Sequence, residues 1–269
     1  SKFNASVGAT QDSIENYQRN VLGDRTITIV EGSSQFDNYR DCTLREIERS
    51  LFLSISHYRR SLDLMIASAS PWLHVTLYYG TFYAAKALLA MFGCSILNKK
   101  VIDVERGNPG NQKLILRRMG NATGQIQYPS NNTGTHQVFW EFFYQAVTPL
   151  KLIVDTNFVP SLTPVNSNPT WFIEIRNQVN YRTSESMRYI ENFYHSFSSS
   201  SFPHSLSGNL ATQYEKFQLL LELTTGYAKD FGISTDVLDF LPPNNNFAET
   251  VGKYIYSEKS PSLVRKTIT

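Results

Sequence analysis

The residues with the clearest chemical potential lie between positions 175 and 182, where the chain reads Ile-Arg-Asn-Gln-Val-Asn-Tyr-Arg. On a helix that turns about 100° per residue, Arg176, Asn177, Asn180 and Tyr181 fall on one arc about 140° wide beside an apolar face. A guanidinium offers a fixed fork of donors that matches phosphate oxygens. Asn and Tyr side chains can orient a ribose or a partner backbone. This string therefore predicts a site for a phosphate-bearing ligand.

The same residues also fit purely structural roles. Arg176 could pair with Glu174, with Glu185 or with a helix end. Tyr181 could be a tyrosine at the edge of the core, bonded through its hydroxyl. Both alternatives stay open at the level of sequence.

A second group of candidates is basic and lies between positions 99 and 118. Lys99, Lys100, Arg117 and Arg118 are the residues that we expect to contact an RNA backbone. The alternative is a solvated basic face. The net charge of the whole chain is +2, which does not by itself indicate a nucleic-acid binder.

Other kinds of chemistry lack a signature in the sequence. His74, His136 and His204 have no partner at metal-ligand spacing, so we expect no metal site. No P-loop, Gly-x-Gly-x-x-Gly, Gly-x-Ser-x-Gly or His-Glu-x-x-His motif occurs, and no cofactor is expected. Cys42 and Cys94 are expected to be unlinked thiols in a reducing compartment.

The elements that must position these residues are mainly helical, because apolar residues recur at steps of three and four. We expect an all-α fold, with minor β structure from the β-branched run 26–30 near the N-terminus. The segment 93–134 is rich in Gly, Asn and Pro and predicts a loop with one short basic helix, Gln112 to Met119. The longer helices are expected at 44–67, 71–92, 136–155, 170–197, 209–231 and about 245–257, with the first, second and fourth packed together.

These elements divide the chain into three parts. Residues 1–43 form an N-terminal arm, and residues 44–198 form a helical bundle with a long insertion at about 93–135. Residues 199–269 form a C-terminal helical extension and tail.

The helix expected at 71–92 is apolar almost all round, which is typical of a central helix in a bundle or of a membrane span. Lys86 in its middle and the lack of a second span favour the bundle. Gly80, Ala84, Ala87 and Ala90 would let a neighbouring helix approach closely. No signal peptide is recognised at the start, so we expect a cytoplasmic protein and no membrane partner.

Two stretches resemble the HEPN family of small helical domains. Residues 77–89, Leu-Tyr-Tyr-Gly-Thr-Phe-Tyr-Ala-Ala-Lys-Ala-Leu-Leu, resemble the second helix of that family, and the preceding His57-Tyr58-Arg59-Arg60-Ser61-Leu62 resembles the end of its first helix. Arg176-Asn177 followed by three residues resembles the family's Arg-Asn-x-x-x-His motif. Tyr181 stands where the motif has His.

The resemblance implies a HEPN-like helical bundle that acts on RNA, in stress response or in defence against phage. Active family members use the motif Arg and His across a dimer interface to cleave RNA without a metal. On this reading Arg176, Asn177 and Tyr181 are the catalytic residues. Because a phenol is a poor base at neutral pH, a second reading is a catalytically silent HEPN-like dimer that binds a partner protein or nucleotide. A helical subunit unrelated to HEPN is the third.

Overall fold

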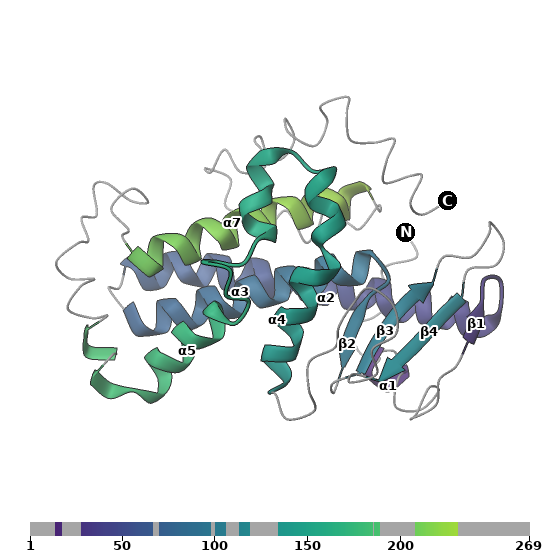
Figure 1. Ribbon diagram of the computed structural model, residues 1–269, viewed down its shortest axis with the longest axis horizontal. Coiled ribbons are helices and arrows are strands. Elements are labelled where there is room, and N and C mark those ends of the chain that lie inside the picture. Colours follow the sequence, from purple (N-terminus) through teal and green to yellow (C-terminus); the bar gives the residue numbers. More distant parts are fainter. Residues whose placement is uncertain are drawn as a thin grey trace.

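The computed structural model describes residues 14–17, 28–66, 70–97, 100–105, 113–118, 134–184, 186–188 and 208–230. Helices predominate in these ranges, which confirms the expected all-α class, and a small sheet lies at one end (Figure 1). The helix expected at about 245–257 lies outside the described residues, as do most of the expected N-terminal arm and C-terminal tail.

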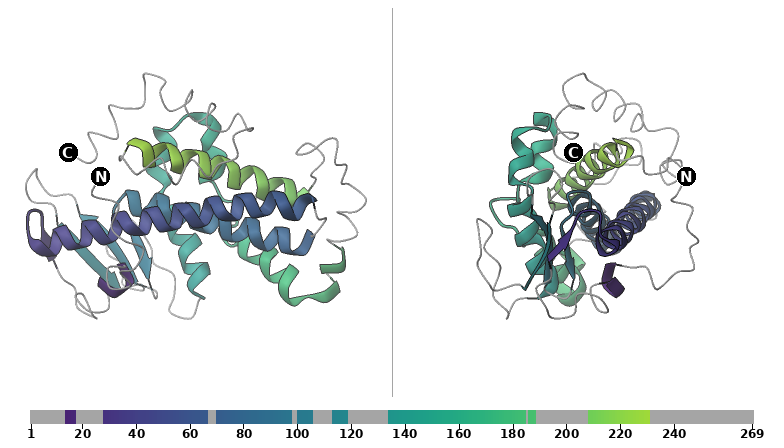
Figure 2. Two further views of the ribbon diagram at one scale, coloured as in Figure 1. Left: turned by 180° about the vertical axis from the view of Figure 1, so that it is seen from behind. Right: turned by 90° about the vertical axis from the view of Figure 1, so that its right-hand side faces the viewer.

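Three long helices form the centre of the fold: α2 (Ser34–Ile66), α3 (Ser70–Met91) and α7 (Gly208–Asp230). Figures 1 and 2 show them side by side along the long axis, with α3 in contact with both of the others. The short helix α1 (Ile14–Tyr17) packs on the first turns of α2. The central position expected for 71–92 is therefore confirmed.

The close approach expected at the small residues of α3 is confirmed at Gly80. A Cβ atom added there would lie 2.3 Å from Cζ of Phe217 on α7. On its other side, the Gly80 carbonyl oxygen accepts a hydrogen bond of 2.9 Å from Ser54 Oγ of α2. Gly80 thus lets both neighbouring helices reach the α3 backbone.

Lys86 gives α3 a charge that the structure balances inside the bundle. Its ammonium group forms an ion pair with Glu46 of α2, and both side chains are largely buried. This pairing explains how an otherwise apolar helix carries a lysine. No helix among the described residues is long and apolar enough to cross a membrane.

Helix α2 begins ten residues before the predicted start at 44. Gly32 has a positive φ of 82° and turns the chain after the strand β1 (Thr28–Val30). Ser33 Oγ then accepts a hydrogen bond of 3.2 Å from the Phe36 backbone N–H. A serine in this place satisfies a backbone donor that a helix start leaves open. The expected boundary at 43/44 therefore falls inside one continuous helix.

The segment after α3 contains the main departure from the predicted secondary structure. Besides β1, the strands are β2 (Ser95–Leu97), β3 (Lys100–Glu105) and β4 (Lys113–Arg118). They form one antiparallel sheet in the order β1-β4-β3-β2. The expected strand near 26–30 is confirmed, but the expected basic helix Gln112 to Met119 is wrong, because residues 113–118 form a strand. Lys, Leu and Arg have high helix propensity, but pairing with β1 and β3 makes this segment a strand.

The expected helix 136–155 is shorter than predicted. Helix α4 spans Thr135–Ala146, and Pro149 lies in the 3₁₀ helix η3 (Thr148–Leu152) that follows. Proline lacks the N–H that an α-helix would need at this point. A second 3₁₀ helix, η4 (Thr156–Leu162), contacts α7.

The expected helix 170–197 also ends early, since α5 spans Trp171–Tyr181. Arg182 leaves the helical region with φ −119° and ψ 99°. The Ser186 hydroxyl then donates to the Val179 carbonyl, which the ended helix leaves unpaired. Helix α5 packs against α3 as predicted.

Candidate functional site

Arg176 lies on α5 above the ring of a tyrosine from the central helix. Its guanidinium carbon is 4.8 Å from the ring centroid of Tyr78 on α3. Its Nη2 and Nε atoms donate to Oδ1 of the next residue, Asn177, at 2.9 and 3.3 Å. The ring and the amide fix the plane of a half-buried cation, as an anion-binding arginine requires. Of the four residues expected to share this patch, Arg176 and Asn177 are thus in direct contact.

Within the described ranges, Arg176 has no carboxylate partner of the kind that a purely structural role would supply. Among the described residues, no Asp or Glu lies within ion-pair distance of its guanidinium. Glu174 instead accepts hydrogen bonds from Thr170 and Asn168 at the start of α5. Glu185 lies outside the described residues. The guanidinium therefore keeps donors for a ligand.

A histidine from α4 completes this arrangement. His136 Nδ1 lies 2.6 Å from the Tyr78 hydroxyl, and its ring contacts Phe82 at a centroid distance of 4.8 Å. Tyr78 thus contacts Arg176 through its ring and His136 through its hydroxyl. Three elements far apart in the sequence, α3, α4 and α5, each contribute one of these side chains.

The electrostatics keep His136 neutral near pH 7. Partial burial lowers the pKa of His136, and the nearby Arg176 guanidinium lowers that pKa further. Burial raises the pKa of Tyr78 to about 12, with the Trp140 indole and Arg176 opposing the rise. In the tautomer in which Nδ1–H donates to the Tyr78 oxygen, the neutral imidazole keeps Nε2 free to accept a proton. His136 is therefore suited to act as a base.

A cluster of aromatic rings extends from Tyr78 toward α2. The half-buried ring of His57 stacks on Tyr79 and Tyr83 of α3, with centroids 6.0 and 5.7 Å away and interplanar angles of 23° and 13°. Tyr79 contacts the Tyr78 ring edge-on at 5.1 Å. We call His57, Tyr79 and Tyr83 the ring cluster.

Tyr181 does not join this arrangement. It is the last residue of α5 and is 78% exposed. Within the described part of the chain it forms no hydrogen bond or ring contact with Arg176 or His136. Tyr181, at the position of the motif histidine, therefore lies at the end of α5 and apart from Arg176. His136 shares the contact with Tyr78 instead.

The expected RNA-binding residues belong to a different part of the fold. Lys99 lies outside the described residues, and the others are in the sheet, where Lys100 of β3 pairs with Arg118 of β4 and Val101 with Arg117. The sheet follows the C-terminal end of α3, whereas α5 packs near its first half (Figure 1). The structure thus brings these basic positions together but not to Arg176.

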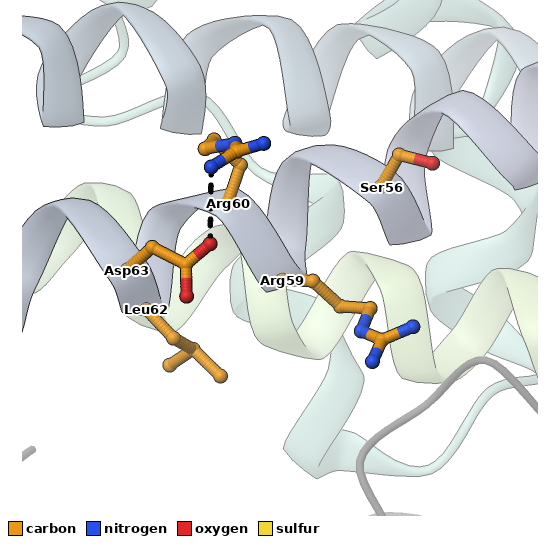
Figure 3. Close-up of a pocket in the computed structure, with 5 residues that line it drawn as sticks. All are labelled: Ser56, Arg59, Arg60, Leu62 and Asp63. Atoms are coloured by element: carbon orange, nitrogen blue, oxygen red, sulfur yellow. Dashed lines mark hydrogen bonds and ion pairs between the residues drawn. The ribbon is translucent and has the colours of Figure 1, made fainter.

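A pocket of about 490 Å³ opens on the outer side of α2. Arg60 and Asp63 form an ion pair of 3.2 Å at this surface, as Figure 3 shows. His57 stacks on α3 instead, so the pocket occupies another face of α2 from the ring cluster. We do not assign it to the site. Its lining residues are Ser56, Arg59, Arg60, Leu62 and Asp63.

Sequence reasoning missed His136, although a signal was present. His136 precedes Phe139 and Trp140 by three and four residues, so the helical period places it on the same face as two buried rings.

No three His, Cys, Asp or Glu side chains within the described ranges gather into a group that could hold a metal ion.

Comparison with known proteins adds no assignment. No family model, curated protein or solved structure matches the chain.

Proposed function

We propose that this chain is a HEPN-like protein that cleaves RNA without a metal, with Arg176 as the phosphate-binding cation and His136 as the base. The proposal joins the sequence resemblance of α3 and α5 to the geometry around Tyr78. The observation that carries it is that Tyr78 contacts both groups. Its ring lies against the Arg176 guanidinium, and its hydroxyl lies against His136.

The chemistry follows from these two groups. His136 takes the proton of a ribose 2′-hydroxyl, and the 2′-oxygen forms a bond to the adjacent phosphorus. The bond from phosphorus to the 5′-oxygen breaks, and that oxygen takes a proton from water. The hydroxide that remains takes the proton from the His136 imidazolium, which restores the neutral base. The products are a 2′,3′-cyclic phosphate and a 5′-hydroxyl end. Arg176 stabilises the charge that builds on the phosphate oxygens.

The remaining residues support this step. Asn177 holds the Arg176 fork through its Oδ1 atom. Tyr78 accepts the Nδ1–H bond of the protonated His136 and so stabilises the imidazolium. Tyr181 is left with a peripheral role. The basic positions of β3 and β4 are kept as a separate contact for the RNA backbone.

A second function is a catalytically silent, dimeric HEPN-like module that binds a nucleotide or a partner protein. The observation in its favour is Tyr181, which stands at the place of the motif histidine and lies exposed at the end of α5. On this account Arg176 binds a phosphate and no bond breaks. A homodimer is expected in both cases.

End-labelled RNA incubated with the protein in EDTA tests the proposal. Wild type should yield fragments that end in 2′,3′-cyclic phosphate. Arg176→Ala should lower the rate roughly 30- to 1000-fold, the effect of one electrostatic donor. Arg40→Ala is the matched control. Arg40 is an exposed arginine near the beginning of α2, where it forms ion pairs with Asp37 and Asp41. Cleavage that survives Arg176→Ala, or that EDTA abolishes, contradicts the proposal. Binding without cleavage supports the silent module.

A further inference from the structure

The ring cluster lies at the edge of the core, against which Tyr79 packs. Tyr78, one residue before Tyr79, is fully buried, whereas Tyr79, Tyr83 and His57 keep part of their surface in solvent. Their planes lie within 30° of one another. Three nearly parallel rings with polar tips therefore share one partly open surface between α2 and α3.

This surface lies a short way from the phosphate-binding cation. The Tyr78 centroid is 4.8 Å from the Arg176 guanidinium carbon and 5.1 Å from the Tyr79 centroid, so Tyr79 is within about 10 Å of that carbon, the sum of these distances. A nucleotide and its neighbouring phosphate span such a separation. Aromatic rings beside a cation are the usual combination for binding single strands, since bases stack on the rings while cations hold the backbone.

We infer that His57, Tyr79 and Tyr83 form a stacking surface for an unpaired nucleobase of the RNA strand whose phosphate binds Arg176. The inference rests on the proposed function and defines its substrate class as RNA with an unpaired nucleotide at the cleavage point. A paired base cannot reach this surface, because its faces are covered by its neighbours in the duplex.

The charges around the cluster fit this occupant. Lys86 follows Tyr83 by three residues on the same side of α3, and its charge is balanced by Glu46. Burial lowers the pKa of His57, which keeps its ring neutral at pH 7 and suited to stacking. Arg176, which contacts Tyr78 beside the cluster, is then the cation that would hold the phosphate while the rings hold the base.

The test measures binding and cleavage separately, with a short fluorescent RNA strand in which the target nucleotide carries a 2′-deoxy ribose and cannot be cut. A second strand is the same but abasic at that nucleotide. Wild type should bind the abasic strand roughly 5- to 150-fold more weakly, the effect of one stacked base. Tyr83→Leu should weaken binding of the complete strand by a similar factor and leave the abasic strand unchanged. Tyr83→Phe keeps a ring and should bind like wild type.

The outcomes separate this inference from the function on which it rests. Arg176→Ala should weaken both strands alike, because it removes the phosphate contact. If wild type binds complete and abasic strands equally, or cuts duplex as fast as single strand, the stacking surface is wrong while RNA cleavage stands. If neither strand binds and no RNA is cut, the proposed function is wrong and the inference that rests on it is wrong as well. If Tyr83→Leu turns a dimer into a monomer and RNA affinity stays constant, the rings form an interface between two copies, which also overturns the inference.

Discussion

Tyr78 of α3 places its ring 4.8 Å from the guanidinium carbon of Arg176 and its hydroxyl 2.6 Å from Nδ1 of His136. One buried side chain thus couples a cation on α5 to a histidine on α4. The coupling is electrostatic as well as geometric, because Arg176 contributes to the lowered pKa of His136.

The pKa of His136 gives the first prediction. Partial burial and then Arg176 lower this pKa, so its titration midpoint should lie below 6.5. In Arg176→Gln the midpoint should move up toward 6.5 and stop short of it, since the burial remains. Proton NMR of the His136 Cε1–H signal against pH measures both values. A wild-type midpoint at or above 6.5, or a midpoint that is the same in Arg176→Gln and wild type, contradicts this coupling.

The contact between α3 and α7 gives the second prediction. Gly80→Ala places a methyl group 2.3 Å from Phe217 Cζ, so the ring or the helix must move. We expect the free energy of unfolding to fall by about 1–3 kcal/mol, despite the better helix propensity of alanine. Gly134→Ala is the control, because its φ of −65° suits alanine and no atom lies within 4 Å. Urea unfolding of both variants measures the difference, and equal stability of Gly80→Ala and wild type would show that the packing is looser.

His74 gives the third prediction, on acid stability. It is 1% exposed, and burial lowers its pKa to about 4, with the bond to Gln213 opposing the shift. The unfolded chain binds a proton at this residue below about pH 6.5, while the native state does so only near pH 4. The free energy of unfolding should therefore fall by roughly 2–3 kcal/mol from this group as pH drops from 7.5 to 4.5.

The control for His74 is the variant His74→Gln, which cannot titrate. Urea unfolding at the two pH values should show a smaller loss in the variant than in wild type. His57 and His136 also have lowered pKa values and act in the same direction in both proteins, so the difference reports on His74. Equal losses in the two proteins would mean that His74 takes up its proton in the native state.

The sequence predicts the helices well because their apolar residues keep one period over many turns. The central place of α3 follows from its composition, and the role of Gly80 from its size. Element ends were harder to predict. The end of α5 depends on the Ser186 hydroxyl, and the strand 113–118 on partners elsewhere in the chain. Local preferences carry neither kind of information.

The site shows the same division. Arg176 and Asn177 are adjacent in sequence, so their helical spacing predicts their shared patch. His136 is 58 residues from Tyr78, and the hydrogen bond that brings it to the site exists only in the folded chain. Tyr181 is predicted from its motif position and its helical arc, and it lies on α5, but as the last residue of that helix it is exposed and makes no contact with Arg176. Residues joined by tertiary contacts thus need the structure to be found.

The most direct test of the central claim compares His136 with Tyr181 in RNA cleavage at pH 7.5 in EDTA. The account predicts that His136→Gln slows cleavage by about 10²- to 10⁴-fold, the contribution of a positioned base, while Tyr181→Phe cleaves at the wild-type rate. Cleavage by His136→Gln at the wild-type rate, or its loss in Tyr181→Phe, would contradict the account.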